Sequence, residues 1–408
     1  VLETSGMTTL HVRNITDVDD KTIRDSQAAG KSLREFTRHW LEKFHADCVA
    51  LNCLAPHIEP SALDHIPQQI AMIEKLIEKG NAYASEDGSV YFKVSSFPEY
   101  GKLSHLDSRE LDLGKTQNQR ADADEYEKDS IADFVLWKSR KAEDGENYWA
   151  SPWGEGRPGW HLECSAMIKE YLGNDFDLHS GGVDLVFPHH ENEIAQSCCA
   201  HPKSQFAQVW LHNEMLQVDG KKMSKSLGNF FTVRDLIEQG FAGEVIRFVF
   251  LSTHYGKPMD WTKERAQDAE KTLRKWRTLS AGIEPASCAA PDVLACLSDD
   301  LNTAGAIGVL HQLAAQGDAA ELLAGARIMG LLLPQMGDWA TTVDVDLSAF
   351  AAALETARIA AMKSKDFSQV DQMKAMLTGA GVEVRMSKTG IELLAGPGFD
   401  PKRLDTLL

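Results

Sequence analysis

Residues 159–167 read GWHLECSAM, and residues 177–193 read DLHSGGVDLVFPHHENE. The two blocks contain Cys164, His189 and Glu193. Thiolate, imidazole and carboxylate groups are the usual donors to a tetrahedral zinc ion. A His and Glu pair combined with a distant Cys is a moderately specific signal for zinc, so the sequence predicts a metal site formed by these three residues.

Pro188 is expected to open a helix at its first turn, where the missing N–H costs nothing. On that helix His189 and Glu193 are four residues apart, so both side chains point the same way. His190 is the alternative ligand. The competing interpretation is a small buried cysteine beside a surface helix rich in His and Glu.

A lysine-rich stretch, DGKKMSKSLGN, occupies residues 219–229. The Asp-Gly pair marks a tight turn after a strand-like segment at residues 209–218. A loop of this composition is able to wrap a polyphosphate and to neutralise charge as it develops. A solvated basic turn would have a similar composition, but KMSKS, at residues 222–226, is a signature of class I aminoacyl-tRNA synthetases.

Four blocks together resemble cysteinyl-tRNA synthetases. They are VRNITDVDDK near the start, GWHLECSAM, HHENEIAQS and KMSKS. They occur in the order of the family and at about its spacing, and the similarity runs from about Val12 to about Met386. The resemblance implies an α/β fold: a Rossmann-type class I catalytic domain with an α+β insertion, followed by C-terminal helical domains.

The resemblance also implies a first strand and a loop with a HIGH-type ATP motif and a further zinc-binding Cys. The 408 residues contain no such segment, and Val1 falls roughly where the first crossover helix of the family is ending. We therefore expect the chain as written not to form cysteinyl-adenylate.

Changes in composition along the chain, together with the resemblance, predict five regions. Residues 1–62 and 154–205 would form the Rossmann-type domain, interrupted by a connective insertion at 63–153. The KMSKS and stem-contact region would span 206–265, a helical bundle 266–340, and an anticodon-binding region 341–408.

Local patterns predict several elements. Residues 8–14 read as a strand, while residues 31–54 and 61–79 have helical periodicity. Asp87-Gly88 would turn a hairpin, and residues 381–386 and 390–394 would form another. The first long helix carries an apolar stripe that we expect in the core: Leu33, Phe36, Trp40, Leu41 and Phe44.

The resemblance assigns roles to further residues. Thr16, just past the predicted first strand, would line the amino-acid pocket, although Thr16 or Asp17 could instead cap the next helix. Trp160 would stand beside the substrate side chain, with plain packing as its alternative. The ATP and adenylate region would contain His179, Gly181, Gly182 and Asp184.

Lys222 and Lys225 would hold the departing pyrophosphate, together with Mg²⁺. Phe367 occupies a position where the family often has a Trp that stacks on an anticodon base. A Phe retains a stacking face, and core packing is the alternative.

Composition agrees with an intracellular enzyme. Hydrophobic residues make up 43% and charged residues 25% of the chain, and no run approaches ~18 apolar residues, so no membrane span is predicted. The seven cysteines are odd in number and scattered, which does not suggest a disulfide framework. A reducing cytoplasm fits this pattern.

The net charge of −18 argues against a general nucleic-acid binder, but a tRNA enzyme needs only a local basic stripe. A solvated helix face is an equally good interpretation of the candidate stripe, which comprises Lys263, Arg265, Lys271, Arg274, Lys275 and Arg277.

The resemblance implies a cysteine–tRNA ligase that uses ATP, L-cysteine and tRNA-Cys, and we expect a monomer. Zinc would bind the substrate thiol as thiolate, a better ligand than the hydroxyl of serine. A ligase that joins cysteine to an amino-sugar would lack a tRNA-reading C-terminus, and the helical region after Asp292 speaks against it. A non-catalytic tRNA-binding protein would also retain these motifs. A zinc hydrolase would explain the metal donors but would leave KMSKS without a purpose.

Overall fold

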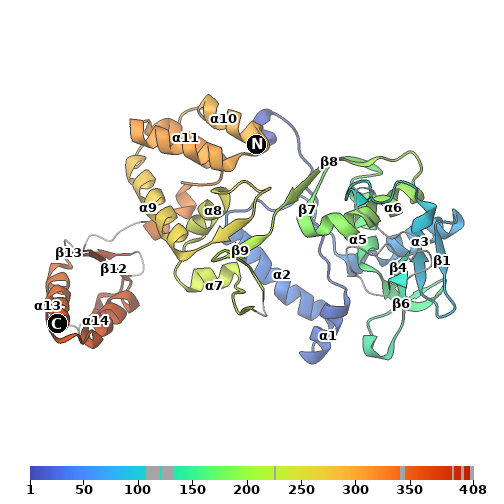
Figure 1. The fold of residues 1–408 in the computed structure, drawn as a ribbon, viewed down its shortest axis with the longest axis horizontal. Coiled ribbons are helices and arrows are strands. Elements are labelled where there is room, and N and C mark those ends of the chain that lie inside the picture. The colour runs from blue at the N-terminus through green and yellow to red at the C-terminus, as the bar shows by residue number, and fades with distance from the viewer. Residues whose placement is uncertain are drawn as a thin grey trace. The chain divides into compact units, whose positions relative to one another are not determined.

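The computed structural model describes residues 1–106, 120–121, 133–224, 227–340, 345–387, 390–396 and 399–404. The chain forms two compact units, whose elements are labelled in Figure 1. The first unit comprises Val1–Val49, Cys53–Phe230 and Thr253–Trp261. The second comprises Ala50–Asn52, Phe231–Ser252 and Thr262–Leu408.

The first unit begins with helices. They are η1 Glu3–Ser5, α1 Asp20–Ala28, α2 Leu33–Ala50, η2 Ala62–His65 and α3 Ile66–Glu78. The helices predicted at 31–54 and 61–79 are therefore confirmed. The cap of α1 is Asp19, because its carboxylate accepts the Thr22 N–H and the Thr22 hydroxyl accepts the Asp19 N–H. Thr16 and Asp17 do not cap this helix.

The strand predicted at residues 8–14 does not form. This segment makes only two isolated parallel bridges, Val12 with Ile58 and Ile15 with Ser61. Pro60 lies between the two partner positions and has no N–H to donate, so a continuous ladder cannot develop there.

The apolar stripe predicted on α2 is only partly buried. Leu33 is in the core, whereas Trp40 is 52% exposed and Phe44 is 45% exposed. Cations cover these rings: the Lys43 ammonium lies 4.8 Å from the Trp40 ring centroid, and the Arg13 guanidinium lies 4.8 Å from that of Phe44. A helical period shows which side of α2 is apolar, but it does not show what covers that side.

A mostly antiparallel sheet follows α3. Its strand order is β1-β2-β4-β6-β5, with β3 pairing in parallel with β4. The hairpin predicted around Asp87-Gly88 is confirmed by the antiparallel β1–β2 pair. The strands and short helices are β1 Ala82–Ala84, β2 Val90–Phe92, η3 Val94–Ser96, β3 Arg120–Ala121, β4 Asp133–Ser139, η5 Ala142–Asp144, β5 Trp149–Ser151 and β6 Gly154–Pro158.

This sheet packs on helices that include α5 Trp160–Tyr171 and α6 Glu191–Ala200. The shared core contains Phe92, Phe134, Leu136, Trp137 and Leu162, among others. Gly159, which precedes α5, is required by this packing, because a Cβ there would lie 2.3 Å from the Val135 carbonyl oxygen. The sheet therefore fixes where α5 begins.

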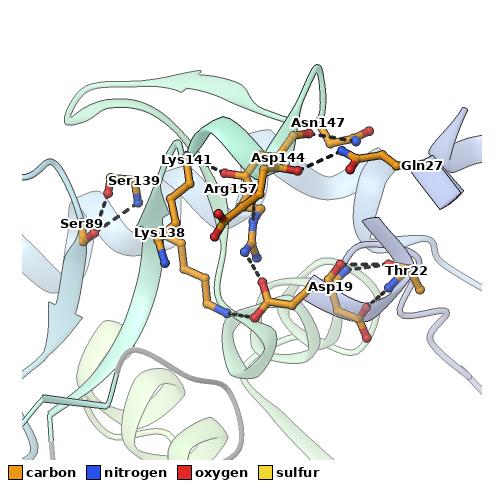
Figure 2. Close-up of polar contacts among 12 residues, drawn as sticks. Asp19, Thr22, Gln27, Ser89, Lys138, Ser139, Lys141, Asp144, Asn147 and Arg157 are labelled. Carbon is orange, nitrogen blue, oxygen red and sulfur yellow. Dashed lines mark hydrogen bonds and ion pairs between the residues drawn. The ribbon is translucent and has the colours of Figure 1, made fainter. Parts of the chain in front are cut away.

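Polar contacts connect the sheet to the start of α1. Figure 2 shows Lys138, Asp144 and Arg157 converging there. Arg157 donates to Asp144 Oδ1 at 3.0 Å and also pairs with Asp20, while Lys138 Nζ donates to Asp20 Oδ2 at 2.9 Å. Gln27 adds a bond from α1 to the Glu143 carbonyl oxygen at 2.9 Å.

Two parallel strand pairs complete the first unit. β7 Asp175–Gly182 pairs with β8 Phe206–Asn213, and α6 connects them as a βαβ unit (Figure 1). The linking turns are η6 Val183–Leu185 and the π-helical η7 Val186–His190. A three-stranded sheet contains β9 Leu216–Val218 between β10 Lys221–Lys222 and β11 Met259–Trp261.

The second unit is mainly helical. Its helices are α7 Val233–Glu238, α8 Gly243–Leu251, α9 Lys263–Leu279, α10 Pro291–Ser298, α11 Thr303–Gln316, α12 Ala319–Ile328, η9 Pro334–Met336, η10 Asp338–Ala340, α13 Ser348–Ser364, α14 Ser368–Gly379 and η11 Pro401–Leu404. The predicted C-terminal hairpin is confirmed as β12 Val382–Ser387 and β13 Gly390–Ala395. It shares a small core with α13 and α14, which includes Leu354 and Leu377.

Much of the candidate basic stripe on α9 is occupied by ion pairs. Arg277 pairs with the buried Glu244 at 2.7 Å, Arg274 pairs with Glu270 and Glu383, and Lys271 pairs with Asp268. At these three positions the cation of the candidate stripe is paired with an acidic group of the same unit. Among the residues that the structure describes, no helix is both long and apolar enough to span a membrane.

Candidate active site

The structure brings the three predicted metal donors together inside the first unit. Cys164 lies on α5, His189 lies in the turn η7, and Glu193 lies in the first turn of α6. All three side chains are buried, and one donor atom from each lies within 4.8 Å of the others. The packing of α5 against α6 produces this arrangement.

The predicted helix start at Pro188 is confirmed. Phe187 has an extended backbone, with φ −136° and ψ 132°, and the residues from Pro188 onward are helical and continue into α6. A residue before proline is disfavoured in the helical region, which accounts for the extended backbone of Phe187. His189 and Glu193 face each other, with Nε2 and Oε2 3.8 Å apart.

A second group of possible donors shares Glu193. It comprises His179, His190 and Glu193, whose donor atoms also lie within 4.8 Å of one another. His179, predicted for the ATP region, bonds through Nε2 to Glu193 Oε2 at 2.9 Å. His190, the alternative ligand, belongs to this second group and not to the group that contains Cys164.

The site also contains two histidines that were not predicted from the sequence. His161 Nδ1 lies 3.0 Å from His189 Nδ1, and His212 Nε2 lies 2.8 Å from His190 Nδ1. His161 precedes Cys164 by three residues on α5, so helical spacing could have indicated a shared face. His212 lies at the end of β8, and no sequence pattern pointed to it.

The charges of the site suit metal binding. Burial raises the pKa of Glu193, but His179 and His189 outweigh it and lower that pKa to about 2. Burial, together with the neighbouring imidazoles, lowers the pKa of His190 to about 3. Glu193 is therefore an anion and His190 a neutral imidazole at neutral pH, the forms that ligate metals.

The remaining donor atoms indicate that a cation fits. Burial and the carboxylates of Glu193 and Glu163 raise the pKa of the Cys164 thiol well above its usual range. A bound cation would reverse this effect and favour the thiolate. In the described part of the chain, the buried Glu193 Oε1 has no hydrogen-bond partner, and such an atom is unusual unless it meets an ion or water.

The predicted amino-acid pocket residues lie beside this group. The Trp160 ring stacks on His189 with centroids 4.4 Å apart. Asn14 Nδ2 lies 3.4 Å from Thr16 Oγ1 and 3.4 Å from Cys164 Sγ. Trp160 therefore contacts the proposed donor His189 directly, and Thr16 is connected to the proposed donor Cys164 through Asn14.

Gly181 and Gly182 end β7, at the carboxyl edge where ligands bind in open α/β sheets. A Cβ on Gly181 would lie 2.9 Å from His190 Cε1, and a Cβ on Gly182 would lie 2.3 Å from Asp184 Oδ1. The buried His190 ring therefore favours glycine at 181, whereas the exposed Asp184 side chain could move away from a Cβ at 182. Asp184 itself is exposed, as a ligand-facing carboxylate would be.

The KMSKS segment begins in a well-defined turn. Asp219 and Gly220 have positive φ angles of 50° and 71°, which suits the tight turn predicted there. Lys222 is exposed on β10, and Asn229 accepts the Ser224 N–H at 2.9 Å and donates to the Lys222 carbonyl oxygen at 3.2 Å. Lys225 lies outside the described residues.

Phe367 lies in the second unit, immediately before α14. Its side chain is 45% exposed, so it is not one of the residues buried in the core between α13 and α14. The alternative interpretation, core packing, is therefore wrong for this residue. An exposed aromatic face remains available for stacking.

The fold and this site define a class of proteins. Residues 1–271 match the family model of the class I (C) tRNA synthetase catalytic domain, which makes the chain a ligase of the aminoacyl-tRNA synthetase class and confirms the predicted fold class. A solved methionyl-tRNA synthetase from Mycobacterium tuberculosis is 15% identical to this chain, with a TM-score of 0.48. The match covers 78% of this chain and 74% of the methionyl-tRNA synthetase chain.

Curated relatives specify the member of that class. A cysteine–tRNA ligase from Ruegeria sp. (strain TM1040) is 57% identical over 97% of this chain and 85% of the relative. The cysteine–tRNA ligase of Paracoccus denitrificans is 56% identical with the same coverage. The chain belongs to the cysteine–tRNA ligase family, which confirms the predicted family and its aminoacylation of tRNA from ATP and an amino acid.

Proposed function

We propose that Cys164, His189 and Glu193 hold a zinc ion that selects the thiol of L-cysteine in the ligation of cysteine to tRNA-Cys. One observation supports this above all: a thiol, an imidazole and a carboxylate converge in a buried site where Glu193 Oε1 has no hydrogen-bond partner among the residues described. The resemblance implies a further Cys ligand in addition to these three donors.

The bound zinc would supply a bond to thiolate that the hydroxyl of serine cannot match. Discrimination of this kind is strong, because a site built around one substrate group rejects analogues that lack it. Trp160, stacked on His189, would exclude water from the side of the pocket. Thr16, held near Cys164 by Asn14, would orient the amino acid.

In the first step the cysteine carboxylate oxygen attacks the α-phosphorus of ATP, the bond to the bridging oxygen breaks, and pyrophosphate leaves. We assign His179, Gly181, Gly182 and Asp184 to the ATP and adenylate region, because they lie at or beside the carboxyl end of β7. Asp184 would accept a hydrogen bond from a ribose hydroxyl.

Lys222 and Lys225 would neutralise the departing pyrophosphate, a task that Mg²⁺ bound with ATP would share. The exposure of Lys222 beside a turn supports this role. In the second step a hydroxyl of the 3′-terminal adenosine attacks the acyl carbon, and AMP leaves. Positioning and charge stabilisation supply most of the rate enhancement.

We place anticodon recognition in residues 341–408, with the exposed Phe367 stacking on a base. Residues 1–62 and 154–205 would be the catalytic domain, 63–153 the connective insertion, 206–265 the stem-contact region and 266–340 the helical bundle. We further propose a monomer in the cytoplasm, where a reducing environment would preserve the seven free cysteines.

Metal analysis tests the proposal. We expect about one zinc per chain, which is lost in Cys164→Ser and in Glu193→Gln. Cys199→Ser is the matched control, because Cys199 packs in the core below the sheet and belongs to neither donor group. Unchanged zinc content in Cys164→Ser would refute the assignment of the metal to these donors.

A further inference from the structure

Each of the three proposed zinc donors hydrogen-bonds to one residue that is not itself in the proposed donor set. Asn14 contacts Cys164, His161 contacts His189, and His179 contacts Glu193. We propose that Asn14, His161 and His179 are positioning residues that orient the three donors toward the metal. This inference rests on the zinc site proposed above.

The contact with His179 makes the two oxygens of the Glu193 carboxylate inequivalent. Its Nε2–H donates to Oε2 at 2.9 Å, whereas Oε1 is buried and has no hydrogen bond in the described structure. Aromatic rings hold the imidazole in place, since its centroid lies 4.9 Å from that of Trp210 and 5.7 Å from that of Phe176. The carboxylate is thereby fixed with Oε1 left for a metal.

His161 sets the tautomer of His189. The two Nδ1 atoms are 3.0 Å apart, so one must donate and the other must accept. If His189 ligates through Nε2, its Nδ1–H donates to His161 Nδ1. Both rings are held by packing, with Trp160 stacked on His189 and Phe134 placed edge-on to His161. Contacts of this kind fix the orientation of metal-bound histidines.

Asn14 joins the metal donor to the amino-acid pocket. Its amide N–H lies 3.4 Å from Cys164 Sγ, and the same nitrogen lies 3.4 Å from Thr16 Oγ1. A hydrogen bond to sulfur stabilises the thiolate and directs its free lone pairs elsewhere. Asn14 therefore ties the direction of the Cys164 side chain to the position of Thr16.

The pair formed by His190 and His212 provides an internal comparison. His212 bonds to His190 at 2.8 Å, and His190 belongs to the second donor group with His179 and Glu193. If the metal occupied that second group, His212 would be the orienting partner and His179 would be a ligand. The two arrangements predict different rankings of variants.

Zinc affinity of the full chain, measured by competition with a chromophoric chelator, tests the inference. We expect Asn14→Ala, His161→Ala and His179→Ala each to weaken zinc binding roughly 10- to 100-fold, with little change in His212→Ala. His179→Gln, which keeps an N–H donor, should recover most of the affinity lost in His179→Phe, which keeps a ring but has no donor.

Several results would overturn the inference. Zinc affinity that is unchanged in all three variants, while Cys164→Ser loses zinc, would refute the positioning roles and leave the proposed site intact. A raised KM for ATP in His179→Ala without any loss of zinc affinity would assign His179 to ATP alone. Loss of zinc in His212→Ala, with zinc retained in Cys164→Ser, would move the metal to the second group and refute the proposed site as well.

A measurement on the unmodified chain covers the case in which a variant does not fold. After selective ¹⁵N labelling of histidine, the zinc-loaded protein should show His189 with zinc on Nε2 and a proton on Nδ1. Zinc on Nδ1 of His189 would contradict the contact with His161 that the inference requires.

Discussion

Lys138 Nζ lies 2.9 Å from Asp20 Oδ2, although 118 residues separate the two in the sequence. Arg157 pairs with the other oxygen of the same carboxylate and with Asp144. The Asp20 carboxylate is therefore a counter-charge for two largely buried cations, Lys138 on β4 and Arg157 on β6. Because β6 leads directly into Trp160, this contact connects the start of α1 to one wall of the proposed cysteine pocket.

Asp20→Asn should lower the free energy of unfolding by about 1–3 kcal/mol, because it leaves buried cations without a full counter-charge. The figure lies below that of a fully buried pair since the Asp20 side chain is 52% exposed. Urea unfolding measures the change. Asp25→Asn on the same helix is the control, because its pair with Arg24 is exposed and should contribute under about 1 kcal/mol. Equal losses in the two variants would contradict the proposed role of Asp20.

The same contact predicts a dependence of stability on pH. Burial raises the pKa of Asp20, but Lys138 and Arg157 outweigh it and hold that pKa below its usual 3.8. A carboxyl whose pKa is lower in the folded state stabilises the protein above pH 3.8, and this stabilisation is lost as the pH falls through the folded pKa. The stability difference between the unmodified chain and Asp20→Asn should therefore shrink as the pH falls below 3.8 and through the folded pKa. A constant difference would show that the charge of Asp20 is unimportant.

Lys222→Ala and Lys225→Ala should each slow cysteine-dependent ATP–pyrophosphate exchange by on the order of 10²-fold, with the affinity for cysteine little changed. The reason is that these ammonium groups would act on charge that develops only as pyrophosphate leaves. The measurement is isotope exchange with a protein that also carries the HIGH-type segment that the resemblance implies. Lys221→Ala is the control, because this exposed neighbour lies on the same short strand. Exchange that is unaffected in both variants would make the segment an ordinary basic turn.

Phe367→Ala should weaken tRNA binding by roughly 1–3 kcal/mol, the range found for one base stacked on an aromatic ring, which is about 5- to 150-fold in Kd. Phe367→Trp should retain the affinity, and ATP–pyrophosphate exchange should not change in either variant. Met362→Ala on α13 serves as the control, because this residue is also apolar and exposed, at 51%, but has no ring. An equal loss of tRNA affinity in the control would show that Phe367 contributes only general apolar surface.

Local chemistry in the sequence predicted much of the structure. The Asp87-Gly88 hairpin, the helices α2 and α3, and the C-terminal hairpin all depend on turn residues and on periodicity within a few residues. The motifs determined the family in the same way, since they are short strings with specific chemistry. The sequence also predicts Cys164, His189 and Glu193 as metal donors, because few other residue types donate to zinc.

Only the tertiary structure decided which groups meet. Asn14 and Cys164 are 150 residues apart, and no periodic pattern predicts their contact. The roles of His161 and His212 depend on how α5, α6 and β8 pack, and the exposure of Trp40 and Phe44 depends on what covers α2. The physical reason is that sequence patterns report which face of an element is apolar or polar, whereas contact between distant residues is fixed by the packing of whole elements against one another.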